Sequence, residues 1–204
     1  ALQHRRITKM QKPKDYDEVQ EYGEYVKLEL GGHIMKIIKV EETKSKSGRG
    51  MLMIYLDTDK SDKQPQFFKN RYDNDNRADK KWGCIVYQIT EDTQTGGTNK
   101  GLKTFIESVK KSNSSSFKVS WDDKFCDCFK NKLVGGVFGR EEFIIPNGKN
   151  EGKSAFSTKL RYFRSVGVIL DGVEIPEDKL LNDRPAMSGN VNVETEDTDD
   201  DYPF

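Results

Sequence analysis

The sequence has no long apolar run that would suggest a membrane segment or a secretion signal. No window approaches the roughly 20 apolar residues that span a bilayer, and the basic residues near the start are not followed by an apolar stretch. These absences favour a soluble chain that is not secreted, and we expect no membrane partner and a reducing, cytoplasmic environment.

Cysteine and histidine are scarce, which argues against several kinds of chemistry. The three cysteines, Cys84, Cys126 and Cys128, are an odd set without the paired spacing of a disulfide framework or a four-ligand zinc site. The two histidines, His4 and His33, lie too far apart in the sequence to indicate acid–base or metal chemistry. We therefore expect no cofactor, no metal site, no catalytic residues and no enzymatic activity.

Two segments resemble ligand-binding loops but depart from their motifs. Residues 96–104 resemble a phosphate-binding loop, yet a residue separates the second glycine from the lysine, where the motif requires adjacency. Residues 73–76 resemble the start of a calcium loop, but the glycine at its sixth position and the glutamate at its twelfth are missing. We interpret the first segment as the entry to a helix and the second as an ordinary loop.

The formal net charge of zero hides an asymmetry between the body of the chain and its C-terminal part. Residues 187–204 contain six acidic residues and no lysine or arginine, whereas the rest carries 34 basic and 28 acidic residues, a net charge of +6. A basic body predicts an anionic ligand, and the acidic segment predicts a separate partner.

Hydrophobic periodicity predicts a mainly β fold: a five-stranded OB-like barrel with one or two helices. The clearest helix signal places Leu102, Phe105, Ile106 and Val109 on one face. Glycines in residues 133–144 would let that strand bend as a small barrel requires. The expected strands, in order, are residues 25–40, with a break at the paired glycines, then 51–56, 82–89, 133–144 and 156–170.

We expect an N-terminal extension over residues 1–22, the OB-like domain over 23–185 and a disordered acidic tail over 186–204.

A single nucleic-acid strand is bound by cationic side chains for phosphates and by aromatic faces on which bases stack. Three segments of the sequence combine these features, although most aromatic residues of a small barrel lie in its core and the lysines of a loop are often merely solvated. The candidate residues are Lys44, Lys46 and Arg49 in a glycine-containing hairpin, then Phe68, Lys69, Arg71 and Tyr72, and finally Lys159, Arg161 and Phe163.

The chain ends in Asp199-Asp200-Asp201-Tyr202-Pro203-Phe204, which resembles the acidic tip of bacterial single-stranded DNA-binding proteins. Phe204 could fill an apolar pocket of a partner while the aspartates meet a basic rim. The body resembles a phage-encoded family of single-strand-binding OB proteins in its Lys/Ser/Gly hairpin at residues 44–50, its helix at 100–111 and its late strand at 159–166. The resemblance implies non-catalytic binding of single-stranded DNA in phage replication, recombination or repair inside a bacterial host. It also implies replication or recombination proteins as partners of the tip. Whether the chain forms a homo-oligomer is left open by the sequence.

Two other functions compete with this interpretation. The first is a protein-interaction scaffold in which the charge of the body is incidental. The second is a metal-dependent nuclease, which would need a cluster of carboxylates in the body.

We also expect the acidic tail to compete with DNA for the cationic groove.

Overall fold

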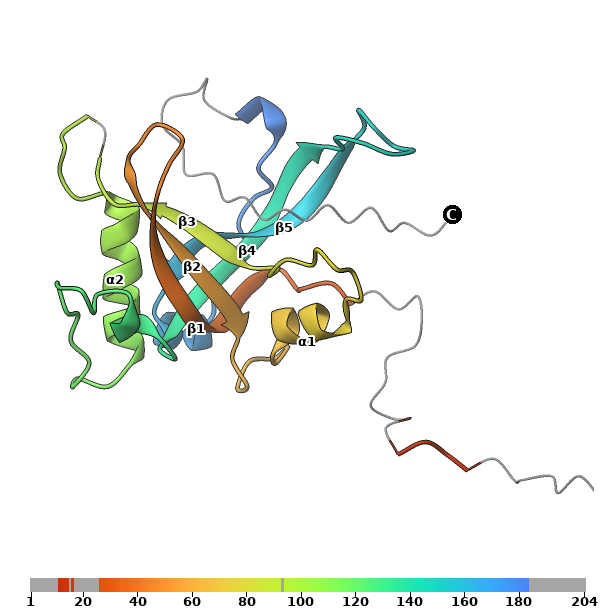
Figure 1. The fold of residues 1–204 in the computed structure, drawn as a ribbon, viewed down its shortest axis with the longest axis horizontal. Helices are drawn as coiled ribbons and strands as arrows, with labels where there is room; N and C mark the ends of the chain where they lie inside the picture. Colours follow the sequence, from red (N-terminus) through yellow and green to blue (C-terminus); the bar gives the residue numbers. More distant parts are fainter. Residues whose placement is uncertain (1–10, 15, 17–25, 93, 184–204) are drawn as a thin grey trace, which may run out of the picture. The chain divides into compact units, whose positions relative to one another are not determined.

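A computed structural model describes residues 11–14, 16, 26–92 and 94–183 (Figure 1). The chain divides into one unit formed by residues 1–27 and 201–204 and another formed by residues 28–200. All the strands and helices described below belong to the second unit. The predicted acidic tail and its tip, residues 199–204, lie outside the described residues.

Five antiparallel strands form one sheet, so the protein is mainly β, as predicted. The order across the sheet is β3-β2-β1-β4-β5, with β3 and β5 at the edges. Within the described residues no ladder joins β3 to β5, so the sheet is not closed and a barrel is not confirmed. The strands are β1 (Gly31–Lys44), β2 (Gly50–Thr58), β3 (Ile85–Ile89), β4 (Leu133–Ile144) and β5 (Ser154–Arg164).

Strand β1 is shared between the two halves of the sheet. Its first six residues pair with β4, and from Met35 onward it pairs with β2 as far as Lys44, which lies opposite Gly50. An extra residue, Ile38, interrupts the ladder with β2; such a bulge bends a strand and increases its twist. The predicted hairpin is confirmed, and Gly48 supplies the positive φ (80°) that its tight turn requires.

Helix α2 (Lys100–Ser112) covers the core between the two edges of the sheet. It contacts β3 on one side and both β4 and β5 on the other. The predicted apolar face is confirmed, because Leu102, Phe105, Ile106 and Val109 are all buried. They join one core cluster with Leu52, Ile54 and Leu56 of β2 and with Val134, Phe138, Leu160 and Phe163 of β4 and β5. Both halves of the sheet therefore enclose the same core.

The last strand ends earlier than predicted. β5 stops at Arg164, and Ser165 caps a short helix, α3 (Val166–Asp171), with its side chain accepting from the Val168 N–H. Ile169 of α3 packs against Gly135, where an added Cβ would lie 2.4 Å from the Ile169 Cγ1 atom. Here the glycine allows the helix to approach the sheet, a role different from the strand bending that we predicted for it.

Two other segments differ from the prediction. Residues 67–74, for which we predicted neither a helix nor a strand, form helix α1 (Phe67–Asn74). The strand expected from Trp82 begins only at Ile85. Two short 3-10 helices complete the fold, η1 (Asp127–Phe129) and η2 (Leu181–Asp183).

Candidate nucleic-acid interface

The tip of the β1–β2 hairpin presents three of the predicted cations. Lys44 and Lys46 are exposed, and Arg49 is partly exposed. The turn is ordered by its own polar groups: the Ser45 and Ser47 hydroxyls lie 2.9 Å apart, and Arg49 Nε donates to Ser47 Oγ at 3.2 Å. The hairpin therefore holds three positive charges on a short, internally bonded loop.

The second predicted segment forms helix α1, at the other end of β2. Phe68 is 6% exposed and packs in the core against Phe138, so it offers no face to a base, and the prediction that it stacks is wrong. Lys69 forms an ion pair with Asp73, and the ring of Tyr72 contacts Trp82 and the ammonium group of Lys80. Arg71 is partly buried in the same helix.

Helix α1 and the hairpin tip do not form one site. The nine residues of β2 separate them, a span of about 25 Å at the usual rise of a strand. The structure therefore does not bring the cations of these two segments together.

The third predicted segment is altered by a β-bulge. Phe138 pairs with Leu160 and Val137 with Tyr162, which leaves Arg161 as the extra residue. Because a bulge shifts the alternation by one position, Leu160 and Phe163 both point into the core, and Phe163 is 4% exposed. The predicted stacking role of Phe163 is therefore wrong. Lys159 and Arg161 remain partly exposed, and an Arg161 Nη1 atom donates to the Arg140 carbonyl at 3.2 Å.

Sequence reasoning missed a row of aromatic and apolar side chains on β2 and β3. Leu52, Ile54 and Leu56 of β2 are buried, so the residues between them point to the opposite side of the sheet. We call this side the outer face; it is formed by Lys39, Glu41, Met53, Tyr55, Ile85 and Tyr87. Tyr55 lies opposite Ile85, and Met53 lies opposite Tyr87. The two tyrosines are therefore diagonal neighbours on adjacent strands.

Charged side chains of β1 flank Tyr55. The Lys39 ammonium nitrogen lies 4.1 Å from the centre of the Tyr55 ring and 2.8 Å from a Glu41 carboxylate oxygen. Burial, together with a hydrogen bond to Glu41, raises the pKa of Tyr55 to about 12. The phenol is therefore neutral at physiological pH and presents an uncharged ring. The signal in the sequence was the alternation of residues 51–56, which separates Leu52, Ile54 and Leu56 from Met53 and Tyr55.

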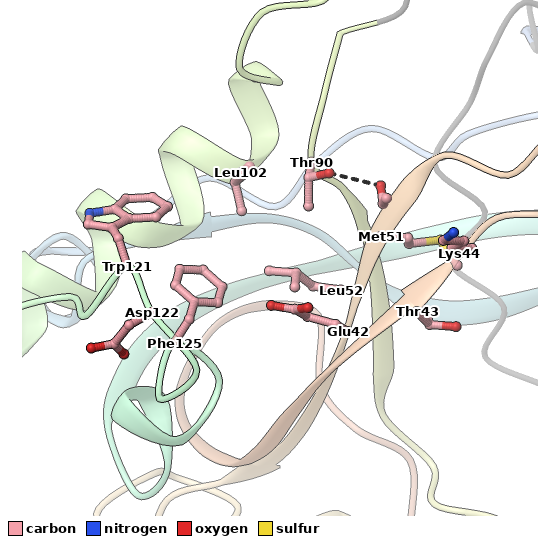
Figure 2. A pocket seen from close by; sticks show the side chains of 11 residues that line it. Glu42, Thr43, Lys44, Met51, Leu52, Thr90, Leu102, Trp121, Asp122 and Phe125 are labelled. Carbon is pink, nitrogen blue, oxygen red and sulfur yellow. Dashed lines mark hydrogen bonds between the residues drawn. The ribbon is translucent and has the colours of Figure 1, made fainter.

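A cleft with a volume of about 570 Å³ opens between the hairpin, the start of α2 and the loop before η1 (Figure 2). Leu52, Leu102 and Phe125 provide apolar walls, and Glu42 and Lys44 contribute charge. Trp121 is 73% exposed at its rim and stacks on Phe125, with ring centroids 5.2 Å apart and an angle of 27° between the planes. The sequence around Trp121 gave no reason to single it out as a site residue.

Two buried carboxylates near α1 serve the fold. Asp62 accepts from His33 Nδ1 at 2.9 Å and from the Ile34 N–H at 2.7 Å. Burial would raise the pKa of Asp62, but the bonds from His33 and the backbone outweigh it and lower the pKa. Burial does raise the pKa of Asp57, against the opposing backbone hydrogen bonds at the start of α1.

The described part of the chain contains no candidate metal site and no candidate membrane-spanning helix. Among residues 11–14, 16, 26–92 and 94–183, no three His, Cys, Asp or Glu side chains are placed to hold a metal ion together. None of the three cysteines, Cys84, Cys126 and Cys128, forms a disulfide in this part of the chain. No helix in these ranges is long and apolar enough to cross a bilayer.

No family model matches the chain, and neither does any curated protein.

Proposed function

We propose that the protein binds single-stranded DNA without catalysing a reaction. The observation that carries the proposal is the outer face: two diagonal tyrosines, Tyr55 and Tyr87, lie on the β2–β3 surface of the sheet whose β1–β2 hairpin carries Lys44, Lys46 and Arg49. Tyrosine rings offer stacking surfaces to bases, and the hairpin cations can neutralise phosphates.

The order of the strands supports the same interpretation. Oligonucleotide-binding OB-folds use the surface of their second and third strands and the loops between strands 1 and 2 and between strands 4 and 5. In this chain those elements are the outer face, the cationic hairpin and the loop between β4 and β5, which contains Lys149 and Lys153. We propose that the sheet is of the OB type and that helix α2 closes the gap between its edge strands, β3 and β5.

The context of DNA binding is proposed from the sequence alone. The resemblance to phage single-strand-binding proteins supports a role in phage DNA replication, recombination or repair inside a bacterial host. The acidic tip, Asp199 to Phe204, would then recruit a replication or recombination protein to the bound strand.

Fluorescence anisotropy of a labelled oligo-dT over a series of salt concentrations tests the proposal, with duplex DNA of equal length as the control. Binding to the single strand should be tight and should weaken steeply with salt, because neutralised phosphates release counterions. Duplex DNA should bind much more weakly. Binding to neither at low salt, even after residues 194–204 are removed, would refute the proposal.

A protein-interaction scaffold is the second candidate, and exposed apolar side chains on and after α3 favour it. Val168, Leu170 and Ile175 are 41%, 70% and 59% exposed. Large apolar side chains exposed close together in the sequence are a feature of interaction sites. This candidate predicts that Leu170→Asp abolishes capture of a protein partner while the protein, with or without its tail, binds no oligonucleotide.

A further inference from the structure

We infer that the cleft below Trp121 binds a nucleobase that carries an exocyclic amino group. This inference rests on the proposed function and adds to it a second contact with the strand, at a site distinct from the outer face. Trp121, Phe125, Glu42 and Lys44 carry the inference.

Trp121 is placed to stack on a flat ligand. It is the most exposed of the large apolar side chains in the described part of the chain, and the ring of Phe125 packs against one of its faces. Phe125 is itself 9% exposed and belongs to the core, so it fixes the position of the indole. A base in the cleft would contact this aromatic pair from the side of the opening, next to Glu42.

Glu42 provides a hydrogen-bond acceptor inside the cleft. Figure 2 shows its carboxylate pointing across the opening toward the Phe125 ring, whereas the carboxylate of Asp122 points away from it. The Asp122 carboxylate instead accepts from the Lys124 N–H at 2.9 Å and from the Ser120 hydroxyl at 2.8 Å, which orders the loop. A carboxylate accepts from the amino group of cytosine, and adenine and guanine carry comparable donors.

Lys44 connects the cleft to the proposed phosphate site. It lines the cleft and belongs to the cationic hairpin with Lys46 and Arg49. A strand held at the hairpin tip can therefore place one of its bases beside Glu42. A basic peptide would also suit an aromatic ring and a carboxylate, but it would meet three like charges on the hairpin, which favours the nucleobase.

The volume of the cleft is compatible with this ligand. Sites for small ligands commonly measure about 300 to 1,000 Å³, and this cleft of about 570 Å³ lies within that range. Leu52, Leu102, Trp121 and Phe125 give it apolar walls, and its charged lining residues are Glu42, Lys44 and Asp122, whose carboxylate points away from the opening.

The first test compares oligo-dC and oligo-dT of equal length by anisotropy. Thymine has no exocyclic amino group, so the wild-type protein should bind oligo-dC more tightly, and Glu42→Ala should remove that preference. Trp121→Ala should weaken oligo-dC binding by about 5- to 150-fold, the range expected for one stacked base, and Trp121→Phe should restore part of it. Phe156→Ala is the matched control, because Phe156 is also an exposed aromatic residue (46%) but lies on β5.

The second test uses fluorescence, since Trp82 and Trp121 are the two tryptophans of the sequence. In a Trp82→Phe variant the emission reports on Trp121 alone, and oligo-dC should quench it. We call the Trp82→Phe variant the reporter. If the wild-type protein binds oligonucleotides, Trp121→Ala binds them equally well and oligo-dC does not quench the reporter, then the inference fails and the proposed function stands. If N-acetyl-arginine amide quenches the reporter and oligonucleotides do not, the cleft is a protein-binding site and the inference is refuted. If the wild-type protein binds no oligonucleotide, the proposed function fails as well.

Discussion

Replacing Lys44, Lys46 and Arg49 together by glutamine should make DNA binding less sensitive to salt. The three side chains lie on the same hairpin tip, and Arg49 is oriented by its bond to Ser47. For single strands the logarithm of the affinity falls with the logarithm of the salt concentration with a slope of about −0.7 per neutralised phosphate. Three contacts therefore contribute about −2 to the slope, or about a 20-fold loss of affinity between roughly 50 and 200 mM salt.

The assay is anisotropy with one labelled oligo-dT over that salt range, for the wild-type protein and the variant. The matched control replaces Lys110, Lys111 and Lys130 by glutamine, since these lysines are exposed near the end of α2 and after η1. This variant has the same change in net charge, so a general charge effect would appear equally in both variants. A hairpin variant with the wild-type slope would show that the hairpin does not neutralise phosphates.

Three further predictions concern the outer face and the core. Tyr55→Ala and Tyr87→Ala should each weaken binding of single-stranded DNA by about 1–3 kcal/mol through lost stacking; unchanged anisotropy titrations for both variants would remove the outer face from the site. Phe163→Ala should instead lower the free energy of unfolding by about 3–5 kcal/mol, because the ring is buried; urea denaturation measures this, and a loss below about 1 kcal/mol would place the ring outside the core. The pKa of Asp57 is raised in the folded state, so its ionisation costs stability as the pH rises from the unfolded toward the folded pKa. Asp57→Asn does not titrate at this position, and its melting temperature should therefore rise relative to wild type as the pH rises above the ordinary pKa of an aspartate; a constant difference would contradict this reasoning.

Elements that depend on local signals could be predicted from the sequence. Helix α2 has its apolar residues at helical spacing, and Asn99 caps it by accepting from the Gly101 N–H. The β1–β2 hairpin has strand-forming residues on both sides of a glycine-containing turn. Helix α2 has almost the predicted bounds. The hairpin is present, but β1 (Gly31–Lys44) begins and ends later than the strand predicted over residues 25–40.

Helix α1 could not be predicted in this way, because its stabilising contact comes from a distant residue. Gln66, at its N-cap, has φ 53° and makes no side-chain cap. Asp57 supplies the cap: its Oδ1 atom accepts from the backbone N–H groups of Phe68 at 2.9 Å and Lys69 at 3.3 Å. Residues 66–74 alone therefore give no signal for helix α1, because the residue that caps it, Asp57, lies outside this segment.

The errors at the candidate site also have physical causes. On β5 the period of two is broken at Arg161, and a bulge leaves no mark in the composition of a strand. The exposure of Trp121 depends on how the loop between α2 and β4 packs on Phe125, which is a tertiary property. The exposure of the hairpin cations could be predicted, because charged side chains in a short turn rarely have a core to pack into.

The sharing of β1 between two partners has a consequence for the order in which the protein folds. The pairing of β1 with β2 closes a loop of a few residues, whereas Gly31 and Phe138 meet across roughly one hundred residues. During synthesis the hairpin can form as soon as β2 leaves the ribosome, while the other edge of Gly31–Lys36 waits for β4. In that interval an unpaired edge containing Ile34 and Met35 is open to pairing with other chains, so the nascent protein is most prone to aggregation before β4 has been made.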